Sequence, residues 1–373
     1  MKLATFSHVN GAWPRRFPDL DSEQTLVLAF AAASFGDRPA AMIELAAAFP
    51  RAALIGCSTA GEIDQTQIRD ESISVAVVQF ERTRVKQVEA RVDASGAFAV
   101  GQQIAAALAS PELRAMLVLA PGTRVNGQAL VDGLNAGLPP QVIATGGLAG
   151  GGERFGKTWV MSGGRIESDK VAAVGLYGER LRVSHGMCGG WETFGTGCVV
   201  TKSRAHVVYE LDGRPALAVY KELLGEHARE LPHNALAFPL AMQAHDGRVA
   251  VRGVMEIDEL AQSLTMAAEI PRGSSVRPMW ASHDRLVREA REAGAAAAGR
   301  SEGPVLCIAI SCFGRRVALG DRSEQETGAA LEALPTGTAQ VGFYSYGEIA
   351  PHASGGCDLH NQSMTLTVLS ESE

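Results

Sequence analysis

The 373-residue sequence lacks the features that mark membrane, secreted and nucleic-acid-binding proteins. No apolar stretch approaches the roughly 20 residues that a transmembrane helix needs, and the start MKLATFSHVNGAW has no apolar core of a secretory signal. Lys and Arg (34) are outnumbered by Asp and Glu (41) and form no basic cluster, so a surface that tracks phosphates is not expected. These absences predict a cytoplasmic protein with no membrane span and no nucleic acid partner.

Cysteine is sparse and scattered, which limits the structural sites that the chain can contain. None of the six cysteines pairs with another at Cys-x-x-Cys spacing, which argues against a disulfide scaffold and a cysteine-rich zinc site. Cys57, Cys307 and Cys312 lie in or beside predicted strands, where a small buried apolar residue is the commonest role. With 46% hydrophobic and 20% charged residues, the composition is that of a folded protein, and the length suits two α/β domains.

Familiar catalytic and metal-binding motifs are missing as well. The nine histidines form no HExxH pair, and the closest metal-like spacing, His185 to Cys188, is weak because it lies on a glycine-rich segment. Ser58 in GCSTAG resembles a hydrolase nucleophile elbow, but the second glycine comes one residue late. Glu62 and Glu348 stand where a phosphate-binding loop needs lysine. The sequence therefore predicts neither a serine hydrolase nor a P-loop.

What the sequence does contain is a repeat. ALIGCSTAGEI near one end returns as QVGFYSYGEIA near the other, with both glycines and the glutamate in register. A weaker third copy, VIATGGLAGGG, keeps the glycines at Gly146 and Gly151 but has Gly152 in place of the acid. The segments around the three loops repeat too, which argues against chance matching.

Each copy of the loop has the same neighbours along the chain. An apolar run leads into a helix-like stretch, then a proline, a short apolar segment, the glycine loop and a further apolar run. This order predicts strand, helix, strand, loop and strand, with right-handed crossovers. We therefore expect a mixed α/β (α+β) fold, with mixed sheets flanked by helices, in two domains: 1–205 with two repeats, and 206–373 with the third repeat at 304–370.

The segment between the second and third repeats has signals of its own. HGMCGGWETFGTG is rich in glycine and predicts an irregular turn. RVAVRGVMEI and SLTMAAEI alternate around a polar turn and predict a hairpin. DGRPALAVYKELLG and WASHDRLVREAREAGAAAAG predict helices, the second of them capped by Ser282.

The repeated loop is the predicted ligand site, because two glycines at a strand end permit positive φ and close backbone approach. We expect the three glycine bends to converge on a common cavity. The alternatives are that Glu62 and Glu348 only tie the loop down, and that Tyr344 and Tyr346 only fill space between sheet and helix. The predicted ligand-binding residues are Gly56, Ser58, Gly61, Glu62, Gly146, Gly147, Tyr344, Ser345, Tyr346, Gly347 and Glu348.

Five segments, taken together, resemble the FIST family of intracellular signal-transduction sensors. They are ALIGCSTAGEI, TGGLAGG, YELDGRPALAVYKELLG, SCFGRR and GFYSYGEIAPHASGGCDLHNQSMTLTVLSE, and they occur in the family's order. The resemblance implies a cytoplasmic, bacterial ligand-sensing protein rather than an enzyme. The chain has no kinase, GGDEF or methyl-accepting segment, so it would act through a separate partner such as a sensor histidine kinase. In this it resembles the nitric-oxide-sensing haem subgroup.

That resemblance implies haem as a cofactor, with one axial histidine and an Arg or Lys at the propionates. The candidate axial ligands are His352, His185 and His233, of which at most one is expected to serve. Two alternatives stay open: a sensor of another small metabolite such as an amino acid, and an enzyme that uses Glu62 and Glu348 as acid and base. A homodimer is considered because dimers are the commonest soluble assembly.

Overall fold

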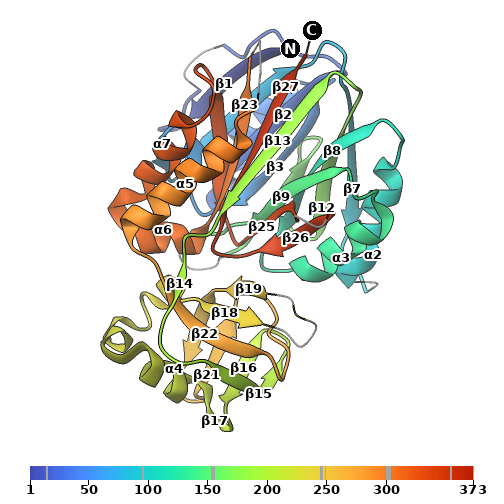
Figure 1. Ribbon diagram of the computed structural model, residues 1–373. Coiled ribbons are helices and arrows are strands. Elements are labelled where there is room, and N and C mark those ends of the chain that lie inside the picture. The colour runs from blue at the N-terminus through green and yellow to red at the C-terminus, as the bar shows by residue number, and fades with distance from the viewer. Residues whose placement is uncertain are drawn as a thin grey trace.

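The computed structural model describes residues 1–13, 16–94, 96–152, 156–243, 247, 249–299, 304–352 and 355–372. It has a larger body with three six-stranded sheets and a smaller body with one nine-stranded sheet (Figure 1). Both chain termini lie at the end of the larger body that is farthest from the smaller one (Figure 1). Among the described residues, no helix combines the length and apolar character that crossing a bilayer requires.

Each sheet of the larger body is built on one of the predicted repeats, and each contains one parallel strand pair joined through a helix. The first has β1 (Lys2–His8), β2 (Thr25–Ala32), η1 (Ala33–Gly36), α1 (Ala40–Ala48), β3 (Ala53–Thr59) and β6 (Ile73–Gln79). The second has β7 (Arg84–Arg91), α2 (Gly96–Leu108), β8 (Leu113–Pro121), α3 (Gly127–Gly137), β9 (Ile143–Ala149) and β12 (Lys170–Tyr177). The third has β13 (Leu181–Cys188), α5 (His283–Ala297), β23 (Leu306–Cys312), α6 (Phe313–Leu319), η4 (Gly320–Arg322), α7 (Ser323–Glu332), β24 (Ala339–Ser345) and β27 (Met364–Glu371).

The edge of each sheet is completed by a hairpin from another repeat. The hairpin of the first repeat pairs with β24 of the third, that of the second pairs with β3 of the first, and that of the third pairs with β9 of the second. The exchange is therefore cyclic and links the three sheets in a closed ring. The hairpins are β4 (Glu62–Asp64) with β5 (Gln67–Arg69), β10 (Val160–Ser162) with β11 (Arg165–Glu167), and β25 (Gly347–Pro351) with β26 (Cys357–His360).

The main core lies where the inner faces of the three sheets meet. Phe30 of the first sheet stacks on Phe343 of the third with ring centroids 4.8 Å apart, and Leu119 of the second belongs to the same cluster. Helices cover the outer faces, where α2 packs on α3 and α5 packs on α7 (Figure 1). Strands covered on both faces need apolar residues at successive positions, which explains the continuous apolar runs in the sequence. The predicted fold class is confirmed.

The smaller body enters the chain between β13 and α5 of the third repeat and has its own apolar core around Tyr220. Its elements are β14 (Glu192–Thr193), β15 (Cys198–Arg204), β16 (Val207–Leu211), β17 (Arg214–Pro215), α4 (Ala216–Leu224), η2 (Gly225–Glu230), η3 (Ala235–Ala237), β18 (Leu240–Gln243), β19 (Val249–Arg252), β20 (Val254–Asp258), β21 (Ser263–Met266) and β22 (Ser275–Trp280). The domain boundary predicted between residues 205 and 206 falls at the turn between β15 and β16, which pair with each other. That boundary stays a prediction.

The hairpin and the helix cap predicted in this part of the chain are present in the structure. The predicted hairpin is present as β20 and β21, and Ser282 caps α5 by accepting a hydrogen bond from the Arg285 N–H at 3.3 Å. The irregular turn predicted over residues 185–197 is confirmed for residues 189–197, apart from the two-residue β14, but is wrong for the first four residues. Residues 185–188 complete β13, because β27, far along the chain, supplies a full antiparallel partner. Gly186 belongs in that strand because a side chain there would collide with the Ala293 carbonyl of α5.

Candidate functional site

The glycine bends of the three repeats meet inside the larger body. The Ala60 N–H of the first bend donates to the Tyr344 carbonyl of the third, and the Tyr344 N–H donates back to the Gly61 carbonyl, both at 2.9 Å. The second bend joins the other two, since Gly150 donates to the Ser58 carbonyl at 2.9 Å and Tyr346 donates to the Leu148 carbonyl at 3.0 Å. The bends thus converge as expected. They are hydrogen-bonded directly to one another, however, and are not arranged around the common cavity that we expected.

The first glycine of each bend has the same structural role. It lies directly opposite a residue of the neighbouring parallel strand, and a Cβ at the glycine would collide with that residue's carbonyl oxygen. The three pairs share one position in the register, so the repeated glycine allows a close approach of two strands in each repeat. The pairs are Gly56 with Ala29, Gly146 with Val118, and Gly342 with Ala309.

The remaining predicted glycines are also packed against protein atoms. Gly61 has a φ of +133° and faces the Arg316 guanidinium so closely that a side chain there would collide with it. A Cβ at Gly147 would lie 3.2 Å from the Gly347 carbonyl, and one at Gly347 would lie 3.4 Å from the Asn361 amide nitrogen. Ser58 is buried, and its hydroxyl accepts a hydrogen bond from the Trp159 N–H at 3.0 Å.

The two repeated glutamates are held in the same way. Glu62 accepts hydrogen bonds from the Thr59 hydroxyl and from the N–H (3.0 Å) and hydroxyl (2.8 Å) of Ser72. Glu348 accepts from the Ser345 hydroxyl at 2.5 Å and from the N–H (3.2 Å) and hydroxyl (2.7 Å) of Ser363. Each carboxyl therefore ties its bend to the strand region that follows it.

Burial dominates the ionisation of both glutamates. Glu62 is 1% exposed and Glu348 is fully buried, and loss of hydration raises the pKa of each to about 7, against the opposing effect of the three hydrogen bonds. A general acid or base must come within hydrogen-bond distance of its substrate. Neither glutamate lines the cleft or the small cavity described below, so this geometry gives no support to the acid–base alternative.

Two consecutive arginines at the start of α6 connect the third repeat to its surroundings. Arg315 is fully buried, and its Nε lies 2.6 Å from Glu326, whose other oxygen accepts from the Tyr344 hydroxyl at 3.0 Å. Tyr344, predicted as a ligand residue, is thus part of a buried ion-pair network. Arg316 donates to the Ala60 carbonyl at 2.7 Å, and its guanidinium lies over the Tyr344 ring, 5.7 Å from the centroid.

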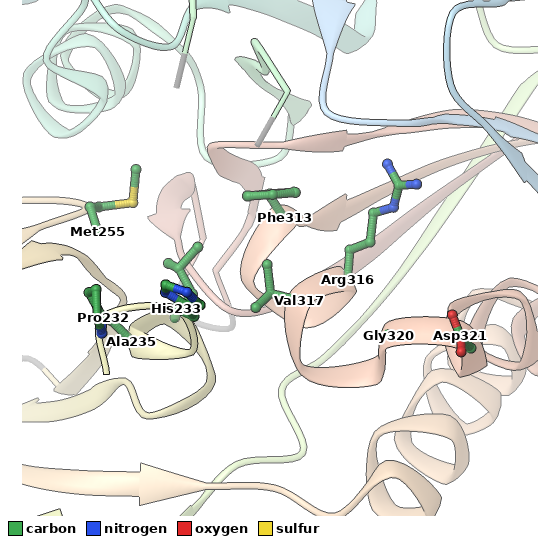
Figure 2. Close-up of a pocket in the computed structure, with 10 residues that line it drawn as sticks. Pro232, His233, Ala235, Met255, Phe313, Arg316, Val317, Gly320 and Asp321 are labelled. Atoms are coloured by element: carbon green, nitrogen blue, oxygen red, sulfur yellow. The ribbon is translucent and has the colours of Figure 1, made fainter. Parts of the chain in front are cut away.

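A cleft of about 680 Å³ lies beside α6, between the larger and the smaller body (Figure 2). Phe313, Arg316 and Val317 extend into it from α6, and Met255 reaches it from the smaller body (Figure 2). Its wall is mixed, because the described lining combines apolar side chains with an imidazole, a guanidinium and a carboxylate. The described residues that line it are Pro232, His233, Ala235, Leu236, Met255, Phe313, Arg316, Val317, Gly320 and Asp321.

A second, much smaller cavity of about 10 Å³ lies behind the wall of this cleft. Leu236, Met255 and Phe313 line both spaces. Among the predicted ligand residues, Ser345 and Tyr346 line the small cavity, and the others line neither space. The remaining lining residues of the small cavity are Gly253, Ala267, Cys312, Gly314, Asn361 and Gln362.

The structure separates the three candidate axial histidines. His233 lies in the connection between η2 and η3, is exposed, and lines the cleft. His185 is on β13, opposite Thr367 of β27, and its side chain is exposed. His352 follows β25, and its backbone N–H donates to the Gly356 carbonyl at 3.0 Å. Neither His185 nor His352 lines the cleft.

Most residues of the cleft and the small cavity are not among those predicted from the sequence. Phe313 and Arg316 belong to SCFGRR, which was noted only as part of a family resemblance. Asn361 and Gln362 are two consecutive amides directly before a predicted strand. Because buried amides need hydrogen-bond partners, such a pair is a signal that could have indicated a binding site. Met255 carries no signal of its own, because an apolar residue in a strand is most often part of a core.

Three interlocked α/β repeats and a smaller body that closes one side of a mixed polar and apolar cleft define a two-body protein with space for a small molecule. Family models match most of the chain: the FIST N domain matches residues 25–214, and the FIST C domain matches residues 216–351. The chain belongs to the FIST family, whose domains are signalling domains that sense small ligands.

Other comparisons add little. A search of curated proteins finds no match to this chain. Among solved structures, a cyanuric acid hydrolase from A. caulinodans is 12% identical, with 78% of this chain and 99% of that chain covered, at a TM-score of 0.16. A likeness that weak supports no conclusion about the fold or the function of this chain.

Proposed function

We propose that the chain senses a small metabolite that binds in the cleft between the two bodies, and that occupancy changes a surface read by a separate signalling partner. The observation that carries this proposal is the cleft itself. Its volume of about 680 Å³ lies within the range of roughly 300–1,000 Å³ that is usual for small-molecule sites. Because both bodies contribute walls, a ligand that contacts both favours one arrangement of the bodies over others.

The chemistry of the lining supports a small polar ligand with an apolar portion. Phe313, Val317 and Met255 supply apolar walls, and Arg316 and Asp321 supply charges of opposite sign. Such a pair suits a zwitterion such as an amino acid, whose carboxylate and ammonium need partners of opposite sign.

Arg316 also connects the cleft with the glycine bends. The same guanidinium that lines the cleft donates to the Ala60 carbonyl of the first bend at 2.7 Å. A ligand that shifts Arg316 acts directly on the contact between the first and third repeats. This provides a physical route from the cleft to the larger body. Because the FIST resemblance implies a separate signalling partner, a sensor histidine kinase is the proposed class of partner.

A haem-binding nitric oxide sensor is the more specific form of the proposal. The lining of the cleft supports haem less well than it supports a small metabolite. His233 is the one candidate axial histidine in the cleft. The two propionates together carry two negative charges and need cations, but the described lining offers them the single guanidinium of Arg316, and Asp321 adds a further negative charge. The test is the absorption spectrum of the full chain expressed with haem precursor. A Soret band that responds to nitric oxide and is lost in His233→Ala supports haem, and colourless protein after haem titration contradicts it.

The metabolite proposal is tested by a thermal-shift screen of the full chain against amino acids and other small polar metabolites. A compound present at 100 times its Kd stabilises the folded state by about 2.7 kcal/mol, which raises the Tm measurably. Val317→Trp fills part of the cleft and should abolish the shift, whereas Leu260→Trp, at a position 99% exposed on the smaller body, should retain it. An equal shift in Val317→Trp would place the ligand elsewhere.

A further inference from the structure

Buried hydrogen-bonding atoms without partners gather behind the wall of the cleft. Asn361 is 5% exposed, and within the described part of the chain neither its amide oxygen nor its amide nitrogen has a hydrogen-bond partner. The amide oxygen of the neighbouring Gln362, which is 1% exposed, has no partner there either. Folded proteins rarely leave buried polar atoms unsatisfied, so three of them at one cavity point to a missing ligand group or water.

Both amides line the small cavity that adjoins the cleft, together with Ser345 and Tyr346 of the third bend. The wall between the two spaces consists of Leu236, Met255 and Phe313, which line both. Met255 and Phe313 come from different bodies (Figure 2). The small cavity has room for about one water molecule, so a ligand group reaches the amides only when side chains of this wall move. Met255 suits such a movement, because a methionine side chain has three rotatable bonds and adapts readily.

The orientation of the Gln362 amide is fixed by its surroundings. Its nitrogen donates to the Leu236 carbonyl of the smaller body at 2.8 Å, which leaves the oxygen as an acceptor. Its backbone carbonyl accepts from the Trp191 indole at 2.7 Å, and its φ of +63° is uncommon for a residue other than glycine. Gly314 packs against the amide so closely that a side chain there would collide with it. Gln362 is therefore held in place at the junction of the two bodies.

The unsatisfied atoms define the complementary group. The site offers two acceptor oxygens and one donor NH₂, and a primary carboxamide presents an NH₂ and a carbonyl oxygen that match them. A carboxylate has no proton for the two oxygens, and an ammonium group has no acceptor for the Asn361 NH₂. We propose that the inner end of the cleft is a subsite for an uncharged primary carboxamide group, recognised by Asn361 and Gln362. This proposal rests on the metabolite site proposed above. The ligand class is thus a small amide whose body lies in the cleft.

This arrangement also gives the ligand contacts with both bodies at once. Gln362 belongs to the larger body but is bonded to Leu236 of the smaller one. Asn361 lies beside Gly347 of the third glycine bend. A carboxamide that completes the hydrogen bonds of these two residues therefore strengthens the junction between the bodies, which is the change that a partner protein would detect.

The test is isothermal titration calorimetry of the full chain with matched pairs: glutamine against glutamate, asparagine against aspartate, and nicotinamide against nicotinate. At least one amide is expected to bind about tenfold or more tightly than its acid, since one net hydrogen bond corresponds to about that ratio. Asn361→Leu should weaken amide binding about tenfold or more. The matched control Asn234→Leu, at an exposed position outside the cleft lining, should bind like the unmodified protein.

A readout of folding separates recognition from structural damage. Asn361→Leu removes an unsatisfied buried amide, so its Tm without ligand should equal or exceed that of the unmodified chain. Acids that bind as tightly as their amides, or unchanged amide binding in Asn361→Leu, would overturn the carboxamide subsite. If none of the amides binds while other metabolites still shift the Tm through the cleft, a water fills the cavity and the subsite is wrong, but the cleft proposal stands. The cleft proposal itself fails separately, through the Val317→Trp comparison.

Discussion

Arg316 of the third repeat and Asp70 of the first form a two-point ion pair, with Nη1 to Oδ1 at 2.8 Å and Nη2 to Oδ2 at 2.7 Å. Asp70 is mostly exposed, but Arg316 is mostly buried and also bonds the Ala60 carbonyl. The pair lowers the pKa of Asp70, chiefly through the hydrogen bonds from Arg316. It joins two parts of the chain that are far apart in sequence, at the wall of the proposed ligand cleft.

Arg316→Lys is expected to destabilise the protein by about 1 kcal/mol, because a lysine cannot reproduce the two-point pair and the bond to Ala60 together. Urea denaturation measures this loss. Arg322→Lys is the control, since its pair with Asp284 is largely exposed and should contribute less than about 0.5 kcal/mol. Equal losses in the two variants would contradict a special role for Arg316.

Disruption of the buried ion pair of Arg315 and Glu326 should destabilise the protein more than Arg316→Lys does. Glu326→Ala leaves a guanidinium without its counter-charge in a fully buried position and should cost about 3–5 kcal/mol. The double variant Arg315→Met with Glu326→Leu should recover much of that loss, because it removes both charges and fills the space. Chemical denaturation of the two variants and the unmodified chain decides this. A double variant less stable than Glu326→Ala would show that the pair matters beyond its charge.

The two repeated glutamates predict a pH dependence of stability. Each has a pKa of about 7 in the folded protein against an ordinary value of 4.5, so the folded state keeps protons that the unfolded state loses. Their contribution is full below about pH 4.5 and is lost as the pH rises through 7, by roughly 3 kcal/mol for each group. The free energy of unfolding of Glu348→Gln should therefore fall less between pH 5.5 and 8 than that of the unmodified chain.

The pH dependence of Glu348→Gln is subtracted from that of the unmodified chain, because other groups also titrate between pH 5.5 and 8. His360 has its pKa lowered by burial, and a histidine of that kind makes stability rise with pH. The difference between the unmodified chain and Glu348→Gln cancels this contribution. An identical pH profile for the two proteins would mean that Glu348 is ionised throughout.

Gly342→Ala tests the close strand contact that the three repeats share. A methyl group at position 342 would collide with the Ala309 carbonyl of the paired strand, and such overpacking costs about 1–3 kcal/mol or prevents folding. Gly197→Ala is the control, since its nearest neighbour, the Val276 carbonyl, would lie at 3.5 Å. Thermal denaturation is the measurement, and equal Tm values for both variants would contradict the packing argument.

The sequence alone predicts the structural features that depend on residues close together in the chain. The repeated order of strand, helix and strand, the cap at Ser282 and the hairpin of β20 and β21 all follow from local periodicity and turn chemistry. The buried state of Cys57, Cys307 and Cys312 is confirmed as well. These features need no knowledge of which distant segments meet.

What the sequence could not supply is pairing over long distances. The strand state of His185 depends on β27, and the cyclic exchange of hairpins depends on contacts between repeats. The site was missed for the same reason. Phe313, Met255 and Asn361 lie far apart in the sequence and acquire a shared role only where the two bodies meet.

The exchange of edge hairpins has a consequence for how such a chain could arise. A single repeat cannot complete its own sheet, because the two strands at one edge of that sheet come from a neighbouring repeat. Three separate copies that lend their hairpins in turn would close the circle as a homotrimer with threefold symmetry. This polypeptide has the architecture of that trimer with its subunits fused. The threefold correspondence is incomplete, because the register position held by Glu62 in the first hairpin and Glu348 in the third is held by the apolar Val160 in the second.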